Sequence, residues 1–297
     1  MNTITPTGHY PELAKAINAS DLYFKREDLH PYGSHKGRSI PVMISYYLER
    51  GDRKFAISSS GNAALAAAMH IKRLNADVGH VSQVGPVHLA VFVGSNISPA
   101  KLDKLKALVD DNIQVKKKDR PLQALAQATG DGSRSLRQST DDTALIGYKT
   151  LAEELAGIEN VGAVFIGTSS GTTAQALAQS FLENKQPTQV HIVQTSSCHP
   201  IADAFGPFDI PEEKSDADAV VDHIAYRKNT LVPLIEKTGG HGWIASNEEI
   251  RSVRELVEKH AGLKISSNGA LSVVGVMQAA RMNFKVNGSA VCLICGD

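Results

Sequence analysis

One stretch of the chain decides the fold: Tyr23-Phe-Lys-Arg-Glu-Asp-Leu-His-Pro-Tyr-Gly-Ser-His-Lys-Gly-Arg38. It begins as a predicted strand, breaks at Pro31 and Gly33, and restarts as a predicted helix near Ser34. Ser34 is a suitable N-cap, so Lys36 is expected in the first helical turn, where the positive end of the helix dipole disfavours an ammonium ion. A nearly neutral amine can form a Schiff base with a carbonyl cofactor. The alternative is a surface loop with a solvated lysine.

The composition argues against several kinds of partner. The 297-residue chain has 31 basic and 31 acidic side chains, so neither nucleic acid nor a membrane surface is an expected partner. No apolar run approaches the roughly 20 residues that cross a bilayer, and no signal peptide is expected. Three cysteines are too few for a disulfide framework and favour a reducing compartment, so we expect a cytoplasmic protein. Cys292 and Cys295 would point to opposite faces of a predicted strand, so no metal site is expected there.

Strands and helices are predicted to alternate along most of the chain. Short apolar strands at 55–57, 87–93 and 113–115 are each followed by a helical segment, and the alternation returns at 161–166 and 189–194. Such alternation predicts the α/β class, in which parallel sheets are wrapped by helices.

Two strand-to-helix turns are candidate anion-binding sites. Ser58-Ser-Ser-Gly-Asn62 precedes a segment of high helix propensity, and Gly167-Thr-Ser-Ser-Gly-Thr-Thr173 precedes a helix predicted from Ala174. Glycines let the backbone approach an anion, hydroxyls donate to it, and the helix N-terminus faces it. An ordinary capped turn is the alternative at both places.

The second turn also fits a serine hydrolase. Gly167-Thr-Ser169-Ser-Gly171 satisfies G-x-S-x-G, the nucleophile elbow, between a predicted strand and a predicted helix. Acids and histidines follow downstream, for example Asp209 and His241. This alternative, with Ser169 as the nucleophile, leaves the segment around Lys36 unexplained.

Three segments, taken in order, resemble the fold-type II pyridoxal phosphate (PLP) enzymes. That family includes threonine synthase, the serine and threonine ammonia-lyases, cysteine synthase and the tryptophan synthase β chain. Residues 25–38 resemble its lysine segment, 59–62 its Ser-Gly-Asn turn, and 169–173 its phosphate-binding loop. Residues 146–155, expected as one helix, resemble a Glu-Gly-Tyr-Lys-Thr-Ile segment of threonine synthases. The combination is specific to the family but not to one member.

The resemblance implies a role for each matching residue. Lys36 would carry the cofactor as an imine and act as acid and base at the substrate α-carbon. Asn62 would contact the cofactor ring and, with its neighbours, the substrate carboxylate. The carboxylate-binding neighbours would be Ser59, Ser60 and Gly61. The phosphate would be held by Ser169, Ser170, Gly171, Thr172 and Thr173.

Two positions depart from the family pattern. Relatives place Thr or Ser before the glycine that follows the last strand, where the hydroxyl meets the pyridine nitrogen, and here that position is Cys295. A thiol is a weak partner, so we expect the nitrogen to stay unprotonated and loss of a leaving group to outrun racemisation. Ser266 and Ser267 stand where relatives often carry Glu-Pro, so substrate details are open.

The resemblance also implies an architecture and a reaction. It implies two α/β domains with PLP in the cleft between them: a large phosphate-binding domain of residues 1–34 and 146–297, and a small substrate-carboxylate domain of residues 35–145. The expected activity is PLP-dependent β/γ-elimination or replacement on a small-molecule amino acid, closest to threonine synthase, in a homodimer. A serine/threonine ammonia-lyase or cysteine synthase-like enzyme is the alternative within the class. A serine hydrolase and a non-catalytic PLP-fold binding protein stand outside it.

Overall fold

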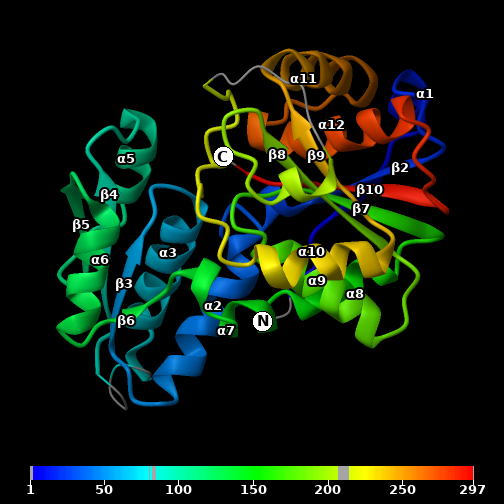
Figure 1. The fold of residues 1–297 in the computed structure, drawn as a ribbon. Helices are drawn as coiled ribbons and strands as arrows, with labels where there is room; N and C mark the ends of the chain where they lie inside the picture. The colour runs from blue at the N-terminus through cyan, green and yellow to red at the C-terminus, as the bar shows by residue number, and fades with distance from the viewer. Residues whose placement is uncertain (1–2, 80, 82–84, 207–213, 297) are drawn as a thin grey trace. The chain divides into compact units, whose positions relative to one another are not determined.

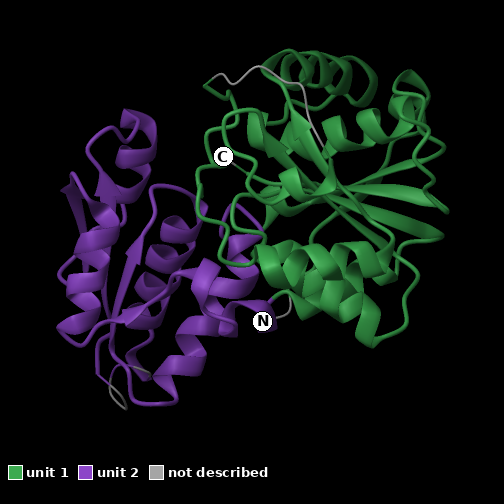
Figure 2. Ribbon diagram, in the orientation of Figure 1, with its two compact units in different colours: residues 1–30, 148–297 green, residues 31–147 purple. Residues whose placement is uncertain are grey.

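The chain folds as two compact units. The structure is a computed structural model that describes residues 3–79, 81, 85–206 and 214–296. Unit 1 comprises Met1–His30 and Tyr148–Asp297, and unit 2 comprises Pro31–Gly147 (Figure 2). In the described residues, no helix is long and apolar enough to span a bilayer.

Unit 1 is built on a sheet with the strand order β1-β2-β10-β7-β8-β9. Every neighbouring pair is parallel except β1 with β2, so the antiparallel strand lies at the edge. The residues of β8 and β10 are almost all buried, as expected for strands covered on both faces. The strands are β1 (Thr7–His9), β2 (Leu22–Arg26), β7 (Val161–Gly167), β8 (Gln189–Thr195), β9 (Gly242–Ala245) and β10 (Ser289–Ile294).

Helices cover both faces of this sheet, as Figure 1 shows. One face carries α8 (Lys149–Ala156), α9 (Thr172–Glu183) and α10 (Lys228–Thr238). The other face carries α1 (Pro11–Ala16), α11 (Asn247–Ala261) and α12 (Ser267–Arg281). Short 3₁₀ turns complete the connections: η1 (Glu27–Leu29) and η3 (Ala202–Phe205) in unit 1, and η2 (Gln138–Thr140) in unit 2.

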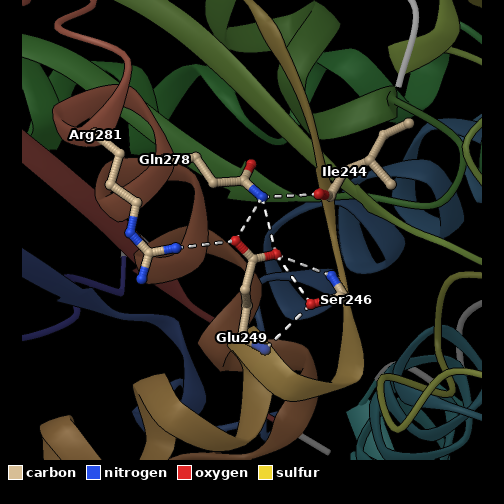
Figure 3. A network of polar contacts seen from close by, with 5 residues as sticks. All are labelled: Ile244, Ser246, Glu249, Gln278 and Arg281. Atoms are coloured by element: carbon tan, nitrogen blue, oxygen red, sulfur yellow. Dashed lines mark hydrogen bonds and ion pairs between the residues drawn. The ribbon is translucent and has the colours of Figure 1, made fainter. Parts of the chain in front are cut away.

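A carboxylate ties α11, α12 and β9 together. Ser246 caps α11 by accepting from the Glu249 N–H at 3.2 Å, and Glu249 Oε2 accepts from the Ser246 N–H at 3.1 Å. The two bonds form a capping box, which satisfies backbone N–H groups at the start of α11. Gln278 Nε2 donates to both Glu249 oxygens at 3.0 Å and to Ile244 O at 2.8 Å, and Arg281 lies 3.5 Å from Glu249 Oε1 (Figure 3).

Unit 2 is a parallel sheet with the order β5-β4-β3-β6. Successive residues of β3 point to opposite faces: Phe55 and Ile57 join the core under α2 and α3, whereas Ala56 packs with Leu125 of α6. The strands are β3 (Lys54–Ser58), β4 (His88–Gly94), β5 (Ile113–Lys118) and β6 (Arg134–Ser135). The helices are α2 (Lys36–Leu48), α3 (Asn62–Ala76), α5 (Pro99–Lys106), α6 (Pro121–Gly130) and α7 (Thr143–Ile146).

The predicted α/β class, with parallel sheets wrapped by helices, is confirmed, and two local predictions are wrong. The single helix predicted over residues 146–155 is two helices, because α7 ends at Ile146 and α8 begins at Lys149. A Cβ on the intervening Gly147 would lie 2.3 Å from the Arg38 carbonyl oxygen, so the chain passes directly against α2 there. The N-cap of α2 is His35 and not Ser34, although Ser34 Oγ still accepts from the Lys36 N–H at 3.3 Å.

Candidate functional site

Two candidate segments lie at the same edge of unit 2. The turn at 59–61 follows β3 and leads into α3, so it lies at the carboxyl edge of the sheet. Helix α2 leads into β3 through a short connection and packs against α3, so its first residue, Lys36, lies at that edge too. Tyr32 shares a hydrogen bond of 2.9 Å with His70 Nδ1, which ties the chain before α2 to α3. Tertiary structure therefore brings Lys36 and the 59–62 turn to one edge of one unit.

The first turn of α2 is fixed firmly while Lys36 itself stays half-buried. Ser39 is fully buried; its Oγ donates to Ala144 O at 2.6 Å and accepts from Gln138 Nε2 at 2.7 Å. The Lys36 N–H donates to Ser34 Oγ, and in the described part of the chain the Lys36 amine forms no ion pair. A helix start that is anchored by buried hydrogen bonds thus carries a half-buried lysine.

The 59–62 turn caps itself. Gly61 is the N-cap residue of α3, and its N–H donates to Ser59 Oγ at 3.2 Å. Ser59, Ser60 and Asn62 are half-buried. A carboxylate that bound the Gly61 N–H would first have to turn the Ser59 side chain away, so the predicted carboxylate site needs a local rotation.

The loop after β7 is shaped by one glycine. Gly171 has φ +78° and is the N-cap residue of α9, and a Cβ there would lie 2.4 Å from Leu231 Cδ2. Thr168 Oγ1 accepts from the Gly171 N–H at 3.0 Å, and the hydroxyls of Ser170 and Thr172 lie 2.9 Å apart. Only glycine fits at this position, because other residues rarely adopt this φ and have no room.

Ser169 has hydrogen-bond partners that do not suit a nucleophile. Its Oγ accepts from the N–H groups of Val221 and Asp222, both at 3.0 Å. In the described residues no histidine ring contacts this oxygen, and His241 packs among the aromatic rings of unit 1 instead. Asp209 lies outside the described residues. The hydrolase alternative therefore lacks the general base that would have to take the serine proton.

Cys295 lies at the carboxyl end of β10. It is 8% exposed, and its Sγ is 4.0 Å from Leu293 O. Its carbonyl accepts from Ser266 Oγ at 3.3 Å, and Ser266 also caps α12 by accepting from the Gly269 N–H at 3.0 Å. The position that departs from the Glu-Pro pattern thus fastens α12 to the end of β10.

The 168–173 loop and Cys295 meet the same edge of the unit 1 sheet. Strands β7 and β10 are parallel neighbours, so their carboxyl ends lie side by side. The chain leaves β7 through α9 on one face, whereas α12, which leads into β10, covers the other face (Figure 1). Open α/β sheets bind ligands at such a reversal of strand order.

Two features of this edge were not predicted from the sequence. Arg227, at the start of α10, is buried and donates to Gln175 Oε1 of α9 at 3.0 Å. No residue near Arg227 in the sequence indicates this contact, because its partner stands 52 positions away. Burial raises the pKa of the Cys198 thiol to about 11, with a contribution from the Asp222 carboxylate, so this thiol stays neutral.

The chain is similar to proteins of one family along almost its whole length. The family described as "Pyridoxal-phosphate dependent enzyme" matches residues 2–296. The threonine synthase of Methanosarcina acetivorans is 25% identical, over 98% of this chain and 74% of that protein. A pyridoxal 5'-phosphate-dependent aspartate racemase superposes with a TM-score of 0.81 at 21% identity, covering 99% of this chain and 90% of the other. The processed form of threonine deaminase isoform 2 from Solanum lycopersicum superposes with a TM-score of 0.78 at 18% identity, covering 99% of this chain and 84% of the other.

Proposed function

Because the chain belongs to the family of pyridoxal-phosphate dependent enzymes, we propose that it catalyses elimination or replacement on a small amino acid, in the manner of threonine synthase. The predicted enzyme class and cofactor are confirmed by the family match. The observation that carries the proposal is the topology of unit 2, in which Lys36 and the 59–62 turn lie at the same edge of the sheet. An amine and an anion-binding turn are the two protein groups that an amino-acid substrate needs at its α-carbon and its carboxylate.

The residues of unit 1 fit a phosphate group. Helix α9 begins at Thr172, and the helix itself offers no acceptor for its first-turn amides, such as those of Thr173 and Ala174. The hydroxyls of Ser169 and Ser170 stand before these amides in the chain. We assign phosphate binding to residues 169–173 of unit 1, and binding of the substrate carboxylate to residues 59–62 of unit 2.

Each residue of the candidate site then has a definite task. Pyridoxal phosphate, when bound, supplies an electron-withdrawing ring that stabilises negative charge at the substrate α-carbon. Lys36 holds the cofactor through its amine and moves the proton at the α-carbon. Asn62 holds the ring, and Ser59, Ser60 and Gly61 hold the carboxylate. Cys295 would face the pyridine nitrogen of the bound cofactor, and a thiol, as a weak hydrogen-bond partner, would not favour a proton on that nitrogen.

A serine/threonine ammonia-lyase is the second candidate. Ser266, which donates to the Cys295 carbonyl, stands where relatives often carry Glu-Pro, so product analysis has to decide between the two reactions. A cysteine synthase-like replacement belongs to the same group of reactions. We further propose that the protein is a homodimer, as the family resemblance implies, and that it acts in the cytoplasm. In the described residues the three cysteines form no disulfide, which supports the second of these assignments.

Labelling of the lysine tests the assignment of Lys36. Borohydride reduction of the protein with bound cofactor, followed by peptide mapping, should place the label on Lys36. Lys54 is exposed on β3 and Lys25 is buried in an ion pair with Glu154, so label on either would overturn the assignment. Lys36→Ala should abolish the absorbance of bound cofactor, whereas the matched control Lys54→Ala should retain it.

Product analysis then separates the reactions. Serine, threonine, O-acetylserine and phosphohomoserine should be supplied in turn to the protein with bound cofactor. Threonine and phosphate would identify a synthase, and a keto acid with ammonia would identify a lyase. If the cofactor bound to Lys36 but no amino acid turned over, the protein would be a binding relative, and the proposed catalytic activity would be wrong.

A further inference from the structure

An irregular segment crosses the edge of unit 1 that carries the candidate phosphate loop. Residues 214–222, here called the strap, belong to no helix or strand, yet Ala217 and Val220 are buried in the core of unit 1. In Figure 1 the strap is part of the yellow stretch that leads to α10. Without a strand partner, the backbone of the strap needs other groups to satisfy its N–H and C=O groups.

One end of the strap is held by an asparagine at the start of α11. Asn247, the first residue of α11, accepts from the Asp216 N–H at 2.7 Å and donates to the Lys214 carbonyl at 2.9 Å. Arg251, one turn further along α11, lies 2.8 Å from the Asp216 carboxylate. Helix α11 therefore anchors this end of the strap.

The other end is held by α12 and by the candidate phosphate loop. Asn268, the second residue of α12, accepts from the Ala219 N–H at 3.0 Å. Ser169 Oγ accepts from the Val221 and Asp222 N–H groups, both at 3.0 Å. The last two residues of the strap thus depend on a single hydroxyl that belongs to the loop before α9.

The Ser169 hydroxyl can hold the strap and still donate one hydrogen bond. A serine oxygen has two acceptor positions and one hydrogen, and here both acceptor positions serve the strap. Only the hydrogen is left to donate, and no atom in the described residues accepts it. A phosphate oxygen held by the 169–173 loop is an acceptor of the kind that this hydrogen needs.

We propose that Ser169 is a positioning residue that couples phosphate binding to the strap. Its hydroxyl donates to the phosphate and at the same time holds the N–H groups of Val221 and Asp222. Gln194 Nε2 donates to the Ser169 carbonyl at 3.3 Å and so restrains the backbone of this residue. The Ser169 side chain can still rotate about its Cα–Cβ bond. A phosphate removes that freedom, and a hydroxyl that donates to a charged oxygen is a stronger acceptor. The inference rests on the proposed function, because the phosphate is that of the cofactor.

Hydrogen–deuterium exchange of the full chain tests the coupling. In the wild type, saturating pyridoxal phosphate should slow exchange of the Val221 and Asp222 amides by about three- to tenfold, the effect of one hydrogen bond. Ser169→Ala should speed exchange of these amides without cofactor and abolish the slowing by cofactor. Ser169→Thr, which keeps the hydroxyl, should restore the slowing.

Ser170 provides the matched control. Its hydroxyl contacts Thr172 within the loop and not the strap. Ser170→Ala should therefore weaken cofactor binding by about tenfold, but at saturating cofactor the strap should still be slowed as in the wild type. A role of Ser169 that was merely structural would change the basal exchange rate without changing the response to cofactor.

Cofactor absorbance, recorded in parallel, separates the two possible failures. Slowing of the strap in Ser169→Ala to the wild-type extent would overturn the coupling, and so would loss of the slowing in Ser170→Ala at saturation. If the wild type bound pyridoxal phosphate but its strap exchange did not change, the coupling alone would be wrong. If the wild type did not bind pyridoxal phosphate, the proposed function would fail and the coupling with it.

Discussion

Replacing His191 with glutamine should remove much of the acid sensitivity of unit 1. His191 lies on β8 with no solvent exposure, and its ring stacks on Phe165 with 4.3 Å between the centroids. Trp243 Nε1 donates to His191 Nδ1 at 3.2 Å, so the hydrogen-bond network assigns the ring proton to Nε2, 3.4 Å from Gln189 Oε1. A second ring proton would lie on Nδ1, where it would place an N–H donor opposite the N–H donor of Trp243.

The size of the effect follows from the pKa. Burial, with a contribution from His241, lowers the pKa of His191 from 6.5 to about 3. Below pH 6.5 the unfolded chain takes up a proton that the folded chain refuses. The contribution of neutral His191 to the free energy of unfolding is therefore complete above pH 6.5 and is lost as the pH falls toward 3. Within this window, each unit by which the pH falls lowers the free energy of unfolding by about 1.4 kcal/mol. Between pH 7.5 and pH 5, His191 should therefore lower the free energy of unfolding by about 2 kcal/mol.

The fluorescence of Trp243, the only tryptophan of the chain, reports unfolding close to His191. Trp243 contacts His191, so its fluorescence during urea titration reports the unfolding of unit 1. His191→Gln keeps an acceptor for Trp243 but cannot titrate, so its loss of stability between the two pH values should be smaller than the wild-type loss by about 2 kcal/mol. A residual slope is expected, because burial also lowers the pKa of His241. His223→Gln, at an exposed position, is the control. Equal losses in His191→Gln and in the wild type would refute the reasoning.

Three further outcomes are expected. Lys25 is 1% exposed and its amine lies 2.6 Å from Glu154, so Lys25→Ala should lower the free energy of unfolding in urea by about 3–5 kcal/mol, and adding Glu154→Gln should recover part of it. Gly171→Ala should weaken pyridoxal phosphate binding and lower stability more than Gly132→Ala, because both have positive φ but only Gly171 lacks room for a Cβ; equal effects in equilibrium titrations would contradict this. Cys295→Asp should raise the share of racemised amino acid in chiral product analysis, since a carboxylate favours a protonated ring nitrogen; if racemised product already dominates in the wild type, the argument from the neutral thiol is wrong.

Local patterns were enough to predict most elements of the fold. The strands β7 and β8 were predicted from short runs of residues that are neighbours in sequence, and the structure has strands at both places. The close approach of Gly147 to the Arg38 carbonyl could not be predicted, because the two residues stand more than 100 positions apart in the chain. Predictions from neighbouring residues gave the type of these elements, although the exact N-cap of α2 was missed by one residue.

The same distinction holds for the candidate site. The amino-acid sequence by itself determined the family, and it pointed to the lysine segment around Lys36 and to both candidate anion-binding turns, because each is a short run whose chemistry is local. Only the tertiary structure decided that Ser169 binds the strap, that Lys25 is buried in an ion pair, and that Arg227 lies against α9. These partners stand tens of residues or more apart in the chain. The order of the strands brings them together, and no local preference of the backbone encodes that order.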